Sequence, residues 1–242
     1  MDLKKRTNLG CIPFFILMLS IALLNPCIVS AGSLDKNSSP NDTEILPSGS
    51  LAIVPFIKGS LAESWRIKSL TPLTCPINQI CLDLNEGDET IMFMNKLDKN
   101  LYLALKKKIG VNLLPREEVK NSYDSLTIDP AKDTTLSLAL DLAAKTKSDY
   151  VLVPILWDYS ERIGNQVAIE QPASVSFDLF LVSAQQGRRV WKGHFDKTQQ
   201  SLTDNLLNAP NFFKLGGKWI TAEELSQIGI DSLLEEFPLP SI

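Results

Sequence analysis

The chain has 242 residues, a formal net charge of -4, and a composition that is 44% hydrophobic and 21% charged. The apolar content excludes an intrinsically disordered chain, and the acidic balance excludes a strongly basic nucleic-acid-binding protein. Only one long apolar stretch occurs, near the start, which excludes a membrane protein with several spans.

The first 31 residues have the three parts of a secretory signal peptide. Basic residues at positions 4–6 precede an apolar stretch over 11–24, and small residues follow at 29–31. This pattern predicts cleavage after Ala31 and a mature protein in the periplasm. Pro26 and the small residues argue against a retained anchor helix. Pro26 also stands where a lipoprotein signal has a small residue, so membrane attachment is expected only if Cys27 is lipidated.

Residues 32–49 are rich in Ser, Asn, Asp, Pro and Gly and predict a flexible leader. Two cysteines remain after cleavage, Cys75 and Cys81. Exported proteins fold in an oxidising compartment, so a local disulfide between them is the favoured interpretation. A metal site would need further His or Cys ligands nearby, and a redox motif would need two residues between the cysteines rather than five.

The mature chain begins with alternating strand and helix patterns. Residues 51–56 form an apolar run that predicts a buried strand. Residues 111–114 predict a short strand, and 116–121 a short helix. Residues 89–109 predict an amphipathic helix, with lysines in its last turn and an apolar side chain every three or four residues. Those apolar residues are Ile91, Met94, Leu97, Leu101, Leu105 and Ile109.

A second helix and a second strand come next. Asp133 or Thr134 is the expected N-cap of a helix through 147. Its inward residues are expected to be Leu136, Leu140, Ala143 and Ala144. Residues 150–157 are apolar on both faces and predict a central strand, in which Pro154 indicates an edge position or a bulge. The polar connection over 158–171 contains Asp158 and Glu161, whose spacing is typical of a solvated loop rather than of a catalytic carboxylate pair.

Residues 173–183 alternate between apolar and polar, turn at Gly187 and return through 189–196, which predicts a β-hairpin. Pairing apolar with apolar side chains sets three pairs opposite one another: Leu181 with Trp191, Leu179 with Gly193, and Phe177 with Phe195. The same register sets Asp178 opposite His194 and Ser176 opposite Asp196. We expect the apolar face to pack on the helices at 89–109 and 134–147. The 204–237 segment should then cover the apolar end of the other face and leave its Asp178–His194 end open.

The last part of the chain predicts a helix from a capping box, Thr221 with Glu224, through 237. Three aromatic residues precede it, Phe212, Phe213 and Trp219. They are expected to cover a sheet edge or to form part of a partner-binding surface, together with Asp178 and His194.

The element order predicts an α/β fold, a single sandwich over 50–200. It has a mixed sheet of roughly five strands with helices on one face. Residues 201–242 are expected to form a C-terminal helical extension packed on this domain.

Three segments resemble a group of bacterial envelope proteins. These are residues 51–56, Lys-Ser-Asp-Tyr-Val-Leu-Val at 147–153, and Phe-Leu-Val-Ser-Ala-Gln-Gln-Gly-Arg-Arg-Val-Trp at 180–191. The group includes the periplasmic domain of the curli secretion subunit, the lipoprotein activators of penicillin-binding proteins and the amino-terminal domain of TolB. Residues 191–207 and 218–225 resemble an uncharacterised family of exported bacterial proteins. The resemblance implies a non-enzymatic envelope role with other envelope proteins as partners.

No pattern indicates a catalytic centre. Ser176, Asp178 and His194 share a face, but a flat strand surface lacks the exposed elbow and oxyanion hole of a hydrolase. His194 is the only histidine, so a metal site would have to use it with Asp178 and Asp196. We therefore expect no enzyme, no cofactor and no nucleic acid, but an exported binding, accessory or assembly factor. The alternative is a periplasmic hydrolase or a small-ligand-binding protein that uses the loop around Cys75.

Overall fold

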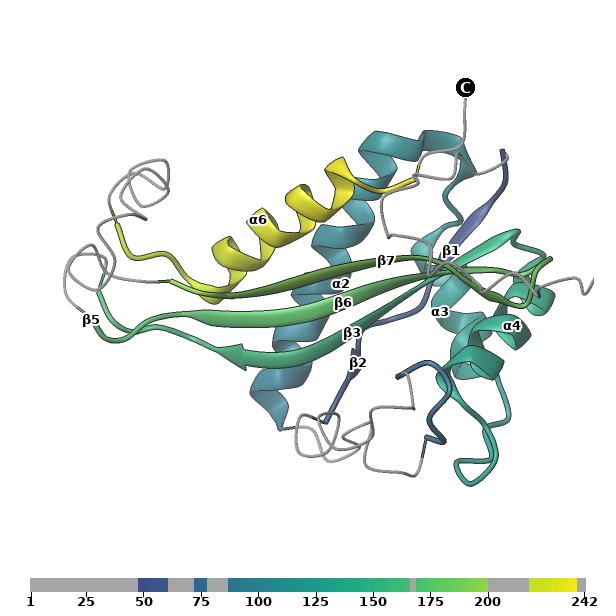
Figure 1. The fold of residues 1–242 in the computed structure, drawn as a ribbon, viewed down its shortest axis with the longest axis horizontal. Coiled ribbons are helices and arrows are strands. Elements are labelled where there is room, and N and C mark those ends of the chain that lie inside the picture. The colour runs from purple at the N-terminus through teal and green to yellow at the C-terminus, as the bar shows by residue number, and fades with distance from the viewer. Residues whose placement is uncertain (1–47, 61–71, 78–86, 166–168, 200–217, 239–242) are drawn as a thin grey trace, which may run out of the picture. The chain divides into compact units, whose positions relative to one another are not determined.

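The computed structural model describes residues 48–60, 72–77, 87–165, 169–199 and 218–238 (Figure 1). They all lie in one compact unit, Thr43–Ile242. Within these ranges no helix is long and apolar enough to cross a membrane. The elements, with the labels of Figure 1, are β1 (Leu51–Ile53), β2 (Ile57–Lys58), α2 (Asp88–Ile109), the 3-10 helix η1 (Gly110–Asn112), α3 (Arg116–Asp124), α4 (Thr135–Thr146), β3 (Tyr150–Ser160), β4 (Ile163–Gly164), β5 (Ile169–Gln171), β6 (Ser174–Ser183), β7 (Arg188–Thr198) and α6 (Ala222–Glu235).

A mixed sheet of five strands forms the centre of this unit. β3 is its middle strand, with β1 and β2 parallel to it on one side and β6 antiparallel on the other. β7 pairs antiparallel with β6 at the end of the strand order. β4 and β5 form a separate two-stranded ribbon. The predicted α/β class and mixed sheet are confirmed.

The register of the β6–β7 hairpin is the predicted one. Leu181 lies opposite Trp191, Leu179 opposite Gly193, and Phe177 opposite Phe195. The polar pairs follow, with Asp178 opposite His194 and Ser176 opposite Asp196. The register shifts between Leu181 and Val182, which leaves Val190 without a partner in the ladder. The hydrophobic pattern specifies this register because a slip of one residue would exchange the two faces of the strand.

β3 tolerates Pro154 in a central position because its neighbouring strand is interrupted there. β1 ends opposite Leu152, and β2 begins opposite Ile155. The carbonyls of Leu152 and Leu156 accept hydrogen bonds from the chain on the β1–β2 side. By alternation, Pro154 turns its missing N–H toward the same side, into the interruption. The expected edge position is therefore wrong, and the nearest bulge lies just beyond Leu156.

Helices cover both faces of the sheet. On the first face, α2 and α6 pack on a core that includes Phe177 and Phe195. On the second face, α3 and α4 pack with Leu73 on side chains that include Val151 and Phe180. Figure 1 shows α6 running along the β6–β7 hairpin and α4 at the right-hand end of the strands.

This distribution corrects the expected positions of two helices. We predicted that α2 and α4 share a face and that the C-terminal helix covers the other, but α4 and α6 have exchanged places. The reason is that β6 is apolar on both sides: Phe177 and Leu179 belong to one core, Phe180 and Val182 to the other. A strand with two apolar faces does not specify which helix covers which face.

Both helix starts that depend on capping were predicted correctly. The Thr134 hydroxyl accepts the N–H of Ser137 at the start of α4, and the Ser137 side chain accepts the Thr134 N–H in return. Thr221 and Glu224 form the same reciprocal pair at the start of α6. Each pair satisfies two N–H groups that the first turn of a helix leaves without partners.

Two helical faces differ in detail from the prediction. In α2, Ile91 is exposed, whereas Phe93 is buried and stacks on Tyr159 with ring centroids 3.8 Å apart. In α4, Ala144 is exposed, and the inward face is turned from the predicted one. The buried residues of α4 are Thr135, Leu138, Ala139, Leu142 and Ala143. The predicted strand over 111–114 is instead η1 followed by a single bridge between Leu51 and Leu113.

Candidate functional site

An ionic cluster lies on the second face of the sheet, where β6 meets β7. Asp178 is buried, and its carboxylate contacts the Lys192 amino group at 3.0 Å and His194 Nδ1 at 2.7 Å. The two basic side chains are 39% and 55% exposed. The structure therefore brings Asp178 and His194 together as predicted, and adds Lys192 to the pair.

The arrangement of this cluster is that of a surface ion network. Ser176 lies on the same face as Asp178. Within the cluster, the contacts of the Asp178 carboxylate are the hydrogen bond with His194 and the ion pair with Lys192. Among the described residues, no group of three or more His, Cys, Asp or Glu side chains is placed to hold a metal ion. A buried carboxylate held by two basic groups stabilises a fixed geometry, with the long lysine stem as cover.

The same basic side chains cover an aromatic residue. Phe180 is fully buried, although it lies beside the exposed end of the face. The Lys192 amino group lies 5.3 Å from the centre of its ring, and the Arg189 guanidinium 6.0 Å. These cations favour the face of an aromatic ring, and their stems exclude water from it.

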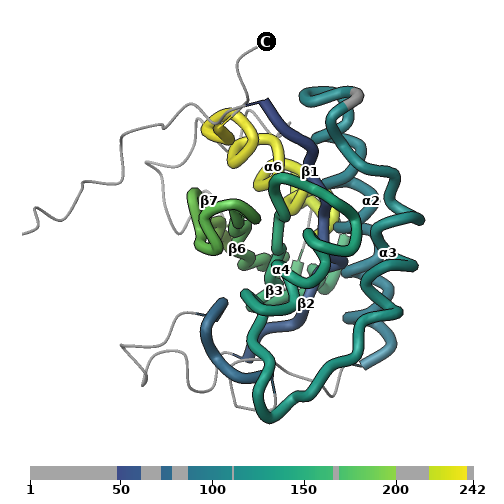
Figure 2. Tube along the Cα trace, turned by 90° about the vertical axis from the view of Figure 1, so that its right-hand side faces the viewer, coloured from purple at the N-terminus to yellow at the C-terminus, as the bar shows by residue number. Residues whose placement is uncertain are grey.

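β7 directs a row of backbone groups away from the sheet. Gln199, just beyond β7, donates its N–H to the carbonyl of Ala173, just before β6. Because N–H and C=O groups alternate in direction along a strand, the odd-numbered residues of this part of β7 face β6. The even-numbered ones, Lys192, His194 and Asp196, therefore turn their backbone groups outward. Within the described ranges β7 pairs with β6 alone, and Figure 2 shows it at the left margin of the coloured trace.

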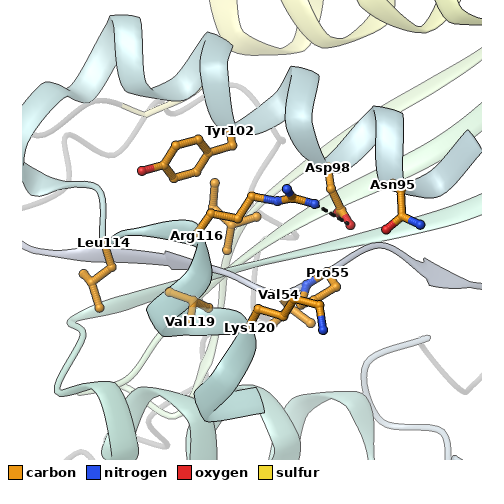
Figure 3. A pocket seen from close by; sticks show the side chains of 10 residues that line it. Val54, Pro55, Asn95, Asp98, Tyr102, Leu114, Arg116, Val119 and Lys120 are labelled. Atoms are coloured by element: carbon orange, nitrogen blue, oxygen red, sulfur yellow. Dashed lines mark ion pairs between the residues drawn. The ribbon is translucent and has the colours of Figure 1, made fainter. Parts of the chain in front are cut away.

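A second feature, which the sequence analysis missed, is a hollow between α2 and α3. Its cavity volume is about 50 Å³. Figure 3 shows the Arg116 guanidinium pointing at Asp98, with Tyr102 and Asn95 on either side along α2. The lining also includes Val54 and Pro55, from the chain between β1 and β2.

Asp98 is the chemically unusual residue of this hollow. It is 8% exposed, and its carboxylate accepts the Phe56 N–H at 2.7 Å. The Arg116 guanidinium stands 4.0 Å from the other carboxylate oxygen. Burial raises the pKa of Asp98 from 3.8 to about 6, against the opposing effects of the Phe56 N–H and the Arg116 charge. One signal could have revealed this residue: an acid within the apolar stripe of α2, between Leu97 and Leu101.

The other predicted site residues are distributed as follows. Trp219 is half-buried just before α6, whereas Phe212 and Phe213 lie outside the described residues. Cys75 is fully buried, and Cys81 lies outside the described residues, so their disulfide stays a prediction.

The two carboxylates of the predicted loop have separate contacts. Glu161 accepts the N–H of Ala222, at the start of α6, at 3.1 Å. Asp158 accepts a long hydrogen bond of 3.4 Å from the Ser174 hydroxyl. Glu161 therefore supports a helix N-terminus, where a negative charge is favourable, rather than pairing with Asp158.

Comparison with known proteins gives likeness in structure only. No family model matches the sequence, and no curated protein matches it significantly. Similar solved structures include the PelC dodecamer from Paraburkholderia phytofirmans, at 11% identity over 81% of this chain and 93% of that chain, with a TM-score of 0.40. Lipoprotein GNA1162 from Neisseria meningitidis is 14% identical over 70% of this chain and 99% of that one, with a TM-score of 0.36. LpoB from E. coli is 13% identical over 82% and 91%, also with a TM-score of 0.36.

Proposed function

We propose that the chain is an exported, non-enzymatic protein of the bacterial cell envelope that binds another envelope protein as an accessory or assembly factor. Export is supported by the signal peptide pattern of the first 31 residues. The observation that carries the binding role is the outward row of backbone groups on β7. Such a row is able to pair with an extended segment of another protein as an additional strand.

The length of β7 suits this role. The strand has 11 residues, and its side chains from Arg188 to Thr198 are mostly exposed. Edge strands are usually protected against strand addition by shortness, by a covering segment, or by charges that repel a strand of the same sign. β7 is long, and within the described ranges it pairs with β6 alone. Main-chain hydrogen bonds would supply the affinity, and the side chains of β7 the specificity.

The alternative, a small-ligand-binding protein, has one observation in its favour, the hollow beside Asp98. Its buried carboxylate already accepts the Phe56 N–H and faces Arg116, whose side chain points into the hollow (Figure 3). These contacts account for Asp98 as a structural group. The hollow therefore carries no second proposal.

The test uses a matched pair of variants at one position of β7. His194→Pro removes an outward N–H without removing a bond to β6, whereas His194→Ala keeps that N–H and removes only the side chain. A photo-crosslinking amino acid at Lys197 reports on the edge, and one at Met92, exposed on α2, serves as the control position.

In the envelope of the source organism, we expect Lys197 to give a discrete protein adduct that His194→Ala retains and His194→Pro loses. Equal melting temperatures of the two variants would show that both are folded. An adduct that survives His194→Pro, or that forms equally from Met92, would contradict strand addition at β7.

A further inference from the structure

The charge of β7 is opposite to that of the whole protein. The strand carries four cationic residues and a single acid, Asp196. The cations are Arg188, Arg189, Lys192 and Lys197, and all are exposed. The complete chain has a net charge of -4, so positive charge is concentrated at this edge. A concentrated charge on a binding surface selects partners of the opposite sign.

We infer that the segment that pairs with β7 is an extended acidic one, with carboxylates at alternate positions. The inference rests on the proposed function and specifies the chemistry of the partner. In an added strand, side chains directly opposite Lys192 and His194 would lie with their Cβ atoms about 4.5–5.5 Å from theirs. Carboxylates at those positions would meet these basic groups from the side away from Asp178.

Asp178 prepares the edge for such a segment. It is buried beneath the sheet surface and holds Lys192 at 3.0 Å and His194 at 2.7 Å. Side chains that are already held in place lose less conformational entropy when a partner binds. The incoming carboxylates would therefore meet two preorganised basic groups, Lys192 and His194, rather than freely moving ones.

The same charges disfavour the two other obvious occupants. A second copy of β7, paired edge to edge, would bring together two strands that each carry four cations and a single acid, and this excess of like charge opposes their association. A basic segment of another protein meets the same repulsion. Charged edge strands are a common means of preventing self-pairing, which leaves an acidic segment of a different protein as the favoured occupant.

The test compares three synthetic peptides of equal length and alternating pattern. Valine alternates with glutamate in the first, with glutamine in the second and with lysine in the third. Binding to the intact mature protein is measured by fluorescence anisotropy at low salt. We expect the glutamate peptide to bind roughly tenfold more tightly than the glutamine peptide, from a few cross-strand charge pairs, and the lysine peptide to bind weakest.

Two controls make the result specific to β7. His194→Pro should abolish binding of the glutamate peptide, because it removes a backbone donor of the edge. Arg189→Glu should weaken binding of the glutamate peptide and strengthen that of the lysine peptide, because Arg189 lies with Lys192 over the Phe180 ring on the same face, and it should leave the Asp178 contacts intact. The preference for glutamate should also shrink in molar salt, because exposed charges are then screened.

The outcomes separate the inference from the proposed function. Equal binding of all three peptides, lost in His194→Pro, would overturn the acidic partner and leave strand addition standing. Binding of the glutamate peptide that persists in His194→Pro would contradict strand addition itself. Absence of binding by the glutamate peptide would overturn the acidic partner, while the Lys197 crosslinking experiment tests strand addition independently.

Discussion

At the scale of single residues, adjacent positions of β6 have very different surroundings. Phe177 is fully buried on the first face, with the Phe195 ring at 5.3 Å and the Phe56 ring at 6.1 Å. Asp178 points to the second face, where its basic partners are exposed to water. The aromatic side chains of the hairpin should therefore contribute more to the free energy of unfolding than its ion network does.

The two sides of β7 and β6 should differ accordingly in mutational cost. We expect Phe177→Ala to lower the free energy of unfolding by about 3–5 kcal/mol, because it leaves a cavity in the first core. We expect His194→Ala to lower it by less than about 1 kcal/mol, because the imidazole is largely exposed and the Asp178 carboxylate keeps its contact with Lys192. Denaturant unfolding of both variants checks the contrast. Equal losses would mean that His194 belongs to a buried site.

Asp98 should give the protein a characteristic pH dependence. Because its pKa is raised to about 6 in the fold, the ionised carboxylate opposes folding. The favourable contribution is complete below the unfolded value of 3.8 and is lost as the pH rises through about 6. Relative to Asp98→Asn, the wild type should gain at most about 3 kcal/mol between neutral pH and about pH 4. Unfolding curves of the two proteins at several pH values measure the difference. A difference independent of pH would contradict the raised pKa.

At the scale of whole elements, one glycine fixes how closely α6 approaches the sheet. A Cβ atom on Gly229 would lie 2.6 Å from the ring of Phe195, on β7. This distance is too short for two carbon atoms, so the helix and the aromatic ring would have to move apart. The absence of a side chain at Gly229 thus determines the packing of α6 on the first face.

We expect Gly229→Ala to destabilise the protein by about 1–3 kcal/mol, although alanine is the better helix former by about 1 kcal/mol. The control is Ser232→Ala on the exposed side of the same helix, which should be neutral or slightly stabilising. Thermal unfolding of the two variants checks this. A stabilised Gly229→Ala protein would show that α6 does not pack on Phe195.

An element could be predicted from the sequence where the order of apolar and polar residues was compatible with a single arrangement. The strands β6 and β7 were compatible with a single register, because Phe177 opposite Phe195 is the pairing that keeps charges away from the apolar face. Two placements of α4 and α6 were compatible with the sequence, because β6 is apolar on both sides. Asp98 was missed because helical periodicity places a single acid among apolar residues at the surface. In the structure its carboxylate is buried, where it accepts the N–H of Phe56, which lies in the interruption between β1 and β2. The candidate edge on β7 required the directions of its backbone groups, which depend on the order of all the strands.

At the scale of the whole molecule, the predictions about processing stand apart from the fold. The mature protein should begin at Gly32, and Cys75 and Cys81 should be bonded to each other, because export exposes both to an oxidising compartment. The intact mass of the unreduced protein should therefore correspond to residues 32–242 less two hydrogens. An intact Met1, a lipid on Cys27 or two free thiols would each contradict one part of this prediction.

The hydrogen bond between Asp98 and Phe56 also makes one backbone amide sensitive to the separation of α2 from the sheet. Within the sheet, backbone amides are protected from exchange with solvent deuterium for as long as the strands stay paired. The Phe56 amide is different, because its acceptor belongs to α2. Its exchange rate should follow the detachment of that helix, even while the amides of β3 and β6 remain protected. One amide at the interruption between β1 and β2 thus reports how firmly the two layers of the first core hold together.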